Sequence, residues 1–475
     1  MLITYADGMG KDLSELRSVL EKYFQGAFTG LHILPFYPSS SDRGFSPIRY
    51  DTVEPEFGDW NDLAGLSQKY TLMYDFMINH LSSQSPQFQD FLEKKDRSPY
   101  AGMFIRYKDF WPGGEPSQKD IDAIYKRKPR APFVEVRFKD GSREKIWCTF
   151  GDDQLDLNVC NEITWDFLKD NLLLLAGKGA SFIRLDAFAY TVKKAGGSCF
   201  FEEPEIWDIL KRVQKIISPV KVELLPEIHE HYTIQLKLAA KGYWVYDFAL
   251  PMLLLHALYT GETTELALWL QICPRKQFTT LDTHDGMGVV DVRGLLTDAQ
   301  IEKTKDFIYA KNPVSRKIVT TAAYKSMDIY QINCTYYSAL GENDAAYLIA
   351  RAVQMFAPGI PQVYYVGLLA GKNDIALVEA TKNGRDINRH AYTPAEIVME
   401  IERPVVRKLF KLIRFRNQFP AFSGTCETTA RGSILTVRRA AGRYAAELTA
   451  DMKTFRFTIV YSGPDVKKHK LEIED

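Results

Sequence analysis

The sequence predicts an α/β fold: a (β/α)8 barrel with two inserted subdomains and a small C-terminal antiparallel β domain. Two observations predict it. Eight short apolar runs, typical of buried parallel strands, alternate with helix-like stretches along most of the chain. The chain has 475 residues, of which 46% are hydrophobic. It is therefore too long for one ordinary core but suits a barrel with insertions and a small extra domain.

The expected strands run from the first residues to about residue 365. They cover residues 2–5, 30–35, 72–78, 180–186, 222–227, 244–248, 277–282 and 361–365. Helical patterns fall between several of them and after the last one. These patterns cover residues 13–23, 60–70, 164–176, 204–216, 345–356 and 404–417.

Two intervals between expected strands are too long for simple loops, and they set the predicted domain boundaries. The barrel is expected to comprise residues 1–77, 161–286 and 342–421. Residues 78–160 form an inserted subdomain after the third strand, and residues 287–341 form a second insertion after the seventh. From residue 422 to residue 475 the pattern changes to short alternating runs, which predict the C-terminal β domain.

Composition narrows the possible partners and the compartment. Sixty basic residues balance sixty acidic ones, so there is no electrostatic reason to expect nucleic acid or an anionic membrane as a partner. The six cysteines fit no metal-binding spacing, which favours reduced thiols in a cytoplasmic protein. We expect no signal peptide, and no apolar run reaches the roughly 18 residues of a membrane span.

Three apolar runs each lead to a carboxylate, at Asp186, Glu227 and Asp285. In a parallel barrel the C-terminal ends of the strands converge on one pocket, so we expect the three acids to share it. Cleavage of a glycosidic bond needs a proton donor, a second carboxylate and a polar grip on the sugar. The three acids therefore favour that chemistry.

The first two acids suit different roles. Arg184 and Asp186 occupy alternate positions of one strand and face the same way, so the arginine keeps the carboxylate ionised, as a nucleophile must be. Glu227 follows Pro226, and an ionised Asp186 nearby favours the protonated form that a general acid needs. The alternatives are a structural ion pair for Asp186 and an exposed loop position for Glu227.

The third acid and several neighbours suit sugar binding. Asp285 and His284 could bind vicinal hydroxyl groups of a pyranose. A metal site is the alternative, and it is disfavoured because the side chains of residues 282–285 cannot all face one ion if the segment is a strand. His80 ends the third strand, although a lone histidine is more often structural. Phe150 and Tyr190 could stack on a sugar, and ordinary core aromatics are an equal alternative.

Four motifs resemble the signature blocks of the α-amylase superfamily, glycoside hydrolase family 13. They are DFMINH at 75–80, FIRLDA at 182–187, LPEIH at 225–229 and LDTHD at 281–285. Further strings resemble the sucrose phosphorylase branch of that superfamily, among them VYDFALP at 245–251 and GRDINRH at 384–390. The resemblance runs from the N-terminus to about residue 417.

The resemblance implies a retaining double displacement in which Asp186 is the nucleophile, Glu227 the acid/base and Asp285 the transition-state stabiliser. The implied reaction converts sucrose and phosphate into α-D-glucose 1-phosphate and D-fructose through a β-glucosyl-enzyme. Alternatives are a sucrose 6'-phosphate phosphorylase, a related α-glucosidase or transglucosidase, and a catalytically silent carbohydrate-binding protein on the same fold.

The resemblance also implies the contacts of the substrates. The implied sugar-binding residues are Asp42, Phe45, His80, Phe150, Gln154, Arg184, Tyr190, His229, His284, Asp328, Ile329, Tyr330, Gln331 and Arg389. The implied phosphate-binding residues are Tyr125, Arg127, Lys128 and Tyr330. Lys128 stands where some relatives have an arginine, and a lysine binds phosphate as a point charge.

The partners expected on this basis are small molecules: sucrose, inorganic phosphate, glucose 1-phosphate and fructose. We expect no metal and no organic cofactor. We also expect no nucleic acid or membrane partner, and a monomer or a homodimer.

Overall fold

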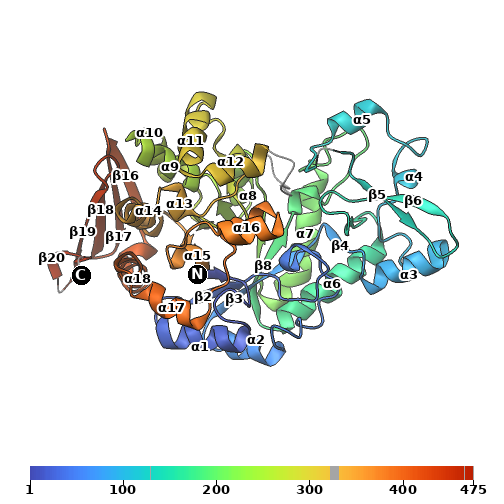
Figure 1. The fold of residues 1–475 in the computed structure, drawn as a ribbon, viewed down its shortest axis with the longest axis horizontal. Coiled ribbons are helices and arrows are strands. Elements are labelled where there is room, and N and C mark those ends of the chain that lie inside the picture. The colour runs from blue at the N-terminus through green and yellow to red at the C-terminus, as the bar shows by residue number, and fades with distance from the viewer. Residues whose placement is uncertain (129, 321–330, 465, 474–475) are drawn as a thin grey trace. The chain divides into compact units, whose positions relative to one another are not determined.

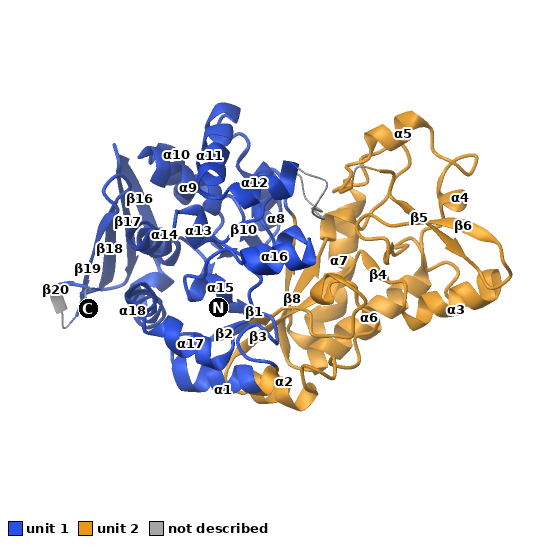
Figure 2. Cartoon of the chain, in the orientation of Figure 1, with its two compact units in different colours: residues 1–11, 15–31, 229–475 blue, residues 12–14, 32–228 orange. Residues whose placement is uncertain are grey.

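The computed structural model describes residues 1–128, 130–320, 331–464 and 466–473, and it divides the chain into two compact units. Unit 1 comprises Met1–Lys11, Glu15–Leu31 and His229–Asp475, and unit 2 comprises Asp12–Ser14 and His32–Ile228 (Figure 2). The strands β1 to β20 and the helices α1 to α18 follow the chain in order (Figure 1). Among the described residues, no helix is long and apolar enough to cross a membrane.

Unit 2 is built on three parallel strands, β3 (Thr71–Met77), β8 (Ala180–Asp186) and β9 (Glu223–Pro226). Its main helices are α2 (Trp60–Ser67), α6 (Glu162–Gly177) and α7 (Glu205–Ile217). The register places Asp75 opposite Arg184 and Met77 opposite Asp186. Because the strands are parallel, the residues that follow β8 and β9 leave the sheet at the same edge.

The chain between β3 and β8 forms an insertion with its own small core. Its strands are β4 (His80–Ser82), β5 (Phe133–Arg137), β6 (Arg143–Trp147) and β7 (Gln154–Asp156), and its helices are α3 (Pro86–Lys94), α4 (Tyr107–Phe110) and α5 (Gln118–Ala123). β4 pairs with β7 and β5 with β6, both antiparallel. Trp147 is buried against Tyr107 and Trp111, which gives the insertion an aromatic centre.

Unit 1 contains the pairing that closes a barrel. Its first strand, β1 (Leu2–Thr4), pairs in parallel with β15 (Val363–Tyr364), the end of the eighth expected strand. β10 (Val245–Asp247), β11 (Gln277–Thr279) and β14 (Ile360–Pro361) are also parallel to one another. Pairing between the first and last strands is what a closed sheet requires.

The second expected strand is β2 (Gly30–Ile33), so each of the eight expected strands has a counterpart in the structure. Short strands β12 (Met287–Gly288) and β13 (Gln331–Ile332) pair antiparallel. The helices are α1 (Leu13–Tyr23), α8 (Thr233–Ala240), α9 (Leu250–Thr260), α10 (Thr264–Ile272), α11 (Asp298–Lys311), α12 (Pro313–Thr320), α13 (Tyr336–Ala339), α14 (Asp344–Phe356), α15 (Tyr365–Leu368), α16 (Ile375–Thr381), α17 (Pro394–Ile401) and α18 (Pro404–Gln418).

Six of the eight expected strands are shorter than the sequence predicts, and the seventh and eighth differ most. The run expected at 277–282 is a strand only as far as Thr279, and the run at 361–365 is divided into β14 and β15, which pair with different neighbours. Burial continues past the last paired residue in the first case, since Leu281 is buried. The apolar run therefore marks burial, and the hydrogen-bonded strand ends earlier.

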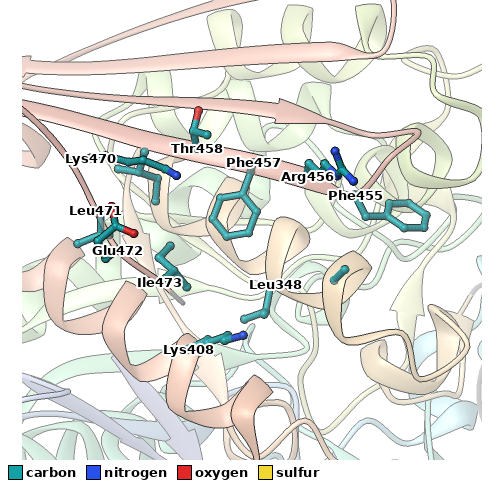
Figure 3. A pocket seen from close by; sticks show the side chains of 12 residues that line it. Leu348, Lys408, Phe455, Arg456, Phe457, Thr458, Lys470, Leu471, Glu472 and Ile473 are labelled. Atoms are coloured by element: carbon teal, nitrogen blue, oxygen red, sulfur yellow. The ribbon is translucent and has the colours of Figure 1, made fainter. Parts of the chain in front are cut away.

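The C-terminal part of unit 1 is the expected antiparallel sheet. Its strands are β16 (Thr425–Arg431), β17 (Ile434–Ala441), β18 (Tyr444–Asp451), β19 (Arg456–Gly463) and β20 (Val466–Lys470). The sheet lies against α14 and α10 (Figure 1). A cavity of about 560 Å³ separates β19 and the segment after β20 from α14 and α18, with Phe457 and Leu348 facing each other across it (Figure 3).

A buried ion pair ties α14 to the loop after β11. Arg351 donates through Nη2 to both carboxylate oxygens of Asp282, at 2.9 and 2.7 Å, and its side chain is fully buried. A Cβ on Gly367 would lie 2.0 Å from Asp282 and 2.1 Å from Arg351, so only glycine fits beside the pair. Burial raises the pKa of Asp282, and Arg351 opposes that shift.

Removing the cation should therefore destabilise the fold. Arg351→Met leaves a buried carboxylate without its partner and should lower the free energy of unfolding by about 3–5 kcal/mol in urea denaturation. Arg407→Met is the matched control, because Arg407 forms an exposed pair with Glu402, and it should cost at most about 1 kcal/mol. Equal effects of the two substitutions would contradict a stabilising role for the buried pair.

Candidate active site

The guanidinium of Arg184 organises the acids of unit 2. Its Nη1 donates to Asp75 Oδ1 at 2.5 Å and to Asp186 Oδ1 at 2.9 Å, and its Nη2 lies 3.8 Å from Glu227 Oε1. The side chains of Arg184 and Asp75 are 3% and 0% exposed, whereas those of Asp186 and Glu227 are 15% and 12% exposed. One buried cation therefore holds two carboxylates that solvent or a ligand can reach.

Asp75 is a further member of this cluster, and it is not among the site residues expected from the sequence. It is buried on β3, and its second oxygen lies 2.7 Å from His32 Nε2. The alignment of Asp75 with Arg184 across β3 and β8 brings the pair together. The sequence did contain a signal for this pair, because Asp75 and Arg184 each lie within an apolar run that predicts a buried strand. A buried charge without a partner is costly, so each of them must be paired.

The backbone fixes the position of Glu227. Ala187 N–H donates to Glu227 Oε2 at 3.0 Å, and Glu227 N–H donates to Leu185 O at 3.0 Å. Ala187 has φ of +52°, a left-handed conformation that is uncommon for residues other than glycine. Glu227 is the first residue after β9 rather than its last, which corrects the expected strand end by one residue.

A second set of expected residues lies together near the start of β4. His80 Nε2 is 2.8 Å from Phe45 O, and Gln154 Nε2 donates to the same carbonyl at 2.9 Å. Burial lowers the pKa of His80, so the ring is neutral at pH 7 and its Nε2–H donates to the carbonyl. The Phe150 ring lies 5.5 Å from His80 and 5.1 Å from Tyr190.

Asp285 lies in a loop of unit 1, six residues beyond the end of β11, and not at the strand tip predicted from the sequence. Its Oδ2 is 3.3 Å from His284 Nε2, and its Oδ1 is 3.1 Å from Arg385 Nη1. Asn388 Nδ2 donates to the backbone carbonyl of Asp285 at 2.9 Å. These side-chain contacts, rather than a strand, hold the carboxylate of Asp285 in place. Arg385 and Asn388 are not among the site residues predicted from the sequence.

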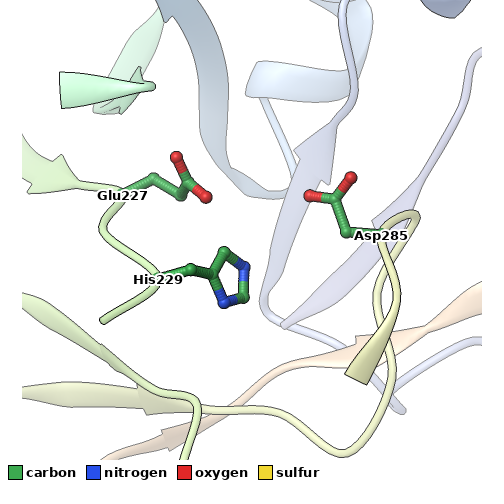
Figure 4. Close-up of side chains that lie close together, drawn as sticks. All are labelled: Glu227, His229 and Asp285. Carbon is green, nitrogen blue, oxygen red and sulfur yellow. The ribbon is translucent and has the colours of Figure 1, made fainter. Parts of the chain in front are cut away.

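Arg389 and His229 lie close to this loop. The fully buried Arg389 donates through Nε to His284 O at 3.0 Å. The His229 ring stacks on Phe248 with centroids 3.7 Å apart, and one of its nitrogens lies within 4.8 Å of an Asp285 carboxylate oxygen (Figure 4).

Two groups of donor atoms among the described residues are close enough to hold a metal ion. The first includes His229 and Asp285, and the second consists of His256, Glu262 and Glu265. Arg385 beside Asp285 places a positive charge at the first position, which disfavours a cation there.

The remaining expected sugar contacts are more scattered. Asp42 is half-buried at the start of a 3-10 turn, with φ of +50°. Gln331 in β13 accepts from the Gly286 N–H at 3.1 Å through Oε1. Asp328, Ile329 and Tyr330 lie outside the described residues.

The expected phosphate-binding residues lie in the insertion of unit 2. Lys128 Nζ donates to Phe150 O at 2.9 Å and to Cys148 Sγ at 3.0 Å, and it is 3.6 Å from Asp152. The guanidinium of Arg127 lies 5.6 Å from the centre of the Tyr190 ring. Tyr125 stacks on Phe200 with centroids 4.5 Å apart. Lys128 is therefore engaged by the protein in this arrangement.

Comparisons with known proteins identify the family of the chain. The family model "Alpha amylase, catalytic domain" matches residues 4–241. A sucrose phosphorylase from Streptococcus mutans is 54% identical over 89% of this chain and 88% of its own length. A glucosylglycerol phosphorylase from Marinobacter adhaerens is 42% identical over 97% of this chain and 96% of its own.

The crystal structure of a sucrose 6F-phosphate phosphorylase from Thermoanaerobacter thermosaccharolyticum superposes with a TM-score of 0.94. It is 41% identical, over 99% of this chain and 97% of its own. The chain therefore belongs to the α-amylase family and to its branch of sucrose phosphorylases and related glycoside phosphorylases. It has the (β/α)8 barrel of that family, with an antiparallel C-terminal sheet.

The Arg184 cluster predicts an effect at Asp75, which no substrate needs to touch. Asp75→Asn removes a charge that fixes Arg184 and should lower kcat by about 100-fold or more, because misplacing a catalytic group by about 1 Å can cost that much. Steady-state kinetics measure the change, and circular dichroism checks folding. Asp51→Asn is the control, because Asp51 forms an exposed pair with Arg49. A folded Asp75→Asn enzyme with unchanged kcat would contradict this role.

Proposed function

We propose that this enzyme is a retaining glycoside phosphorylase that converts sucrose and phosphate into α-D-glucose 1-phosphate and D-fructose. The observation that carries the proposal is the guanidinium of Arg184, which contacts the carboxylates of both Asp186 and Glu227. Retaining enzymes need two carboxylates close together, about 5–5.5 Å apart. The 54% identity to a sucrose phosphorylase supports the choice of donor and acceptor.

In the proposed first step, an Asp186 oxygen attacks C1 of the glucosyl unit while Glu227 gives its proton to the departing fructosyl oxygen. The C1–O bond to fructose breaks, and a β-glucosyl ester of Asp186 forms. Arg184 suits this step because its charge keeps Asp186 ionised before attack. Ala187 N–H orients Glu227 through Oε2.

In the proposed second step, a phosphate oxygen attacks C1 from the side that fructose left, and the bond to Asp186 breaks. Two inversions restore the α configuration. Asp285, held by Arg385 and His284, is proposed to stabilise the positive charge that develops on the sugar in both steps. The neutral ring of His80 and the faces of Phe150 and Tyr190 are proposed to hold the glucosyl ring.

Phosphate must approach carboxylates, so cations are needed to offset the repulsion. Arg127 is a proposed ligand. Lys128 is a second, and to bind phosphate it must leave Phe150 O and Cys148 Sγ. In this proposal Lys128 therefore exchanges its protein contacts for phosphate between the two steps.

A second candidate substrate is sucrose 6'-phosphate. The TM-score of 0.94 to a sucrose 6F-phosphate phosphorylase favours this substrate, since the two backbones superpose over almost the whole of both chains. The basic residues at 126–130 could hold a phosphorylated fructose as well as free phosphate. The acceptor, rather than the chemistry at C1, distinguishes the two candidates.

Product analysis tests the proposal. With sucrose, phosphate should raise the rate of substrate consumption at least about tenfold, and α-glucose 1-phosphate should appear in step with fructose. Sulfate at equal ionic strength is the control for a salt effect, and Asp186→Asn should abolish both products.

Equal rates of sugar release with phosphate and with sulfate would reject phosphorolysis in favour of hydrolysis. A parallel assay with sucrose 6'-phosphate decides between the two acceptors. Consumption of that substrate alone would overturn the choice of sucrose.

A further inference from the structure

Unit 1 contains a second concave feature that none of the proposed catalytic or substrate-binding residues lines. A cavity of about 580 Å³ lies where the C-terminal sheet meets the turn after α14. Arg275 and Arg439 line it, together with Gly359, Phe422 and Cys426. No acidic side chain is among the residues that line it.

Arg439 is the innermost of the charged residues. It lies on β17 and is 4% exposed. Its Nη2 donates to Phe422 O at 2.6 Å, and its Nη1 donates to Phe356 O at 3.4 Å. Its buried Nε has no hydrogen-bond partner among the described residues. Part of the hydrogen-bonding capacity of this guanidinium is therefore unused.

Two further arginines surround Arg439. Arg275 is exposed at the cavity rim and donates to the carbonyls of Leu270 and Gln271, each at 3.1 Å. Arg416 donates to Gly359 O at 3.0 Å and lies 4.7 Å from the centre of the Phe422 ring. The buried Nε of Arg416 also has no partner within the described part of the chain.

The three arginines have no carboxylate partner within 4 Å among the described residues, and carbonyl groups are their oxygen acceptors. Burial, and to a smaller extent the positive charge of Arg439, lower the pKa of Arg416 to about 10. By contrast Arg438, which precedes Arg439 on β17, is exposed and pairs with Glu427 at 3.3 Å. Buried charges are normally paired, so this cluster carries an excess of positive charge.

A purely structural role explains only part of this arrangement. Leu270 lies near the end of α10 and Phe356 ends α14, so Arg275 and Arg439 satisfy carbonyls at helix C-termini. Each helix end carries only about half a negative charge. Two such ends do not neutralise three guanidinium groups, and they leave the cavity open beside them.

We propose that this cavity binds a phosphate dianion between Arg275 and Arg439, either as free phosphate or as the phosphoryl group of a sugar phosphomonoester. Arginine offers paired donors that match the oxygens of such an anion. The volume lies in the usual range of small-molecule pockets and exceeds what inorganic phosphate alone requires. The bound anion supplies the counter-charge that the protein lacks and joins the C-terminal sheet to the barrel segment after α14.

Isothermal titration calorimetry at constant ionic strength tests this site, with inorganic phosphate and α-glucose 1-phosphate as probes. All proteins carry Asp186→Asn, so that neither probe is consumed. Arg275→Met should weaken one binding step about tenfold or more, because a charge-assisted pair is lost. Arg438→Met is the matched control on the neighbouring position of β17, and it should leave that step unchanged. Arg439→Met should abolish the step.

Tighter binding of inorganic phosphate identifies the free ion as the ligand, and tighter binding of glucose 1-phosphate identifies a phosphomonoester. Unchanged binding of both probes in Arg275→Met would overturn the proposal. Arg275 is exposed, so this variant decides the question even where Arg439→Met does not fold. The readout is binding rather than turnover, so the result does not depend on the proposed reaction.

Discussion

The candidate active site depends on one buried guanidinium. The side chain of Arg184 is only 3% exposed, so its charge must be balanced by the protein, and Asp75, Asp186 and Glu227 all lie within 4 Å of it. Asp75 is wholly buried between Arg184 and His32, while the other two acids stay accessible. The shorter contact goes to Asp186 and the longer one to Glu227. The short contact with Arg184 suits the proposed role of Asp186 as nucleophile, and Glu227 is the proposed acid/base of a retaining mechanism.

Strands and loops position the two groups of site residues by different means. Arg184 and Asp186 lie on β8, whose register with β3 is fixed by backbone hydrogen bonds. The positions of their side chains are therefore set by the sheet. Asp285 lies in a loop, and side-chain contacts replace the sheet there, with Arg385 and His284 holding its carboxylate and Asn388 holding its carbonyl. The C-terminal sheet contributes no residue to this proposed chemistry, and its buried Arg439 belongs to the separate anion site proposed above.

Much of the fold follows from the sequence because burial leaves a plain pattern. The helix expected at 13–23 is α1 residue for residue, and β8 coincides with the expected strand. The end of β11 was wrong because Leu281 is buried without being paired, and apolar character reports burial alone. The motif strings located the three acids. Asp75 and Arg385 were not predicted as site residues because their roles depend on distant partners. Strand register brings the partner of Asp75 close and loop folding brings that of Arg385 close, and no local sequence pattern encodes either.

The most direct test of the account is the identity of the covalent intermediate. Glu227→Gln enzyme is mixed with α-glucosyl fluoride in the absence of phosphate, quenched in acid, digested and analysed by mass spectrometry. Fluoride leaves without needing a proton, so the first step proceeds and the intermediate accumulates. The account predicts one glucosyl group on the peptide that contains Asp186. A glucosyl group on another residue, or turnover of the fluoride with no labelled peptide, would contradict it.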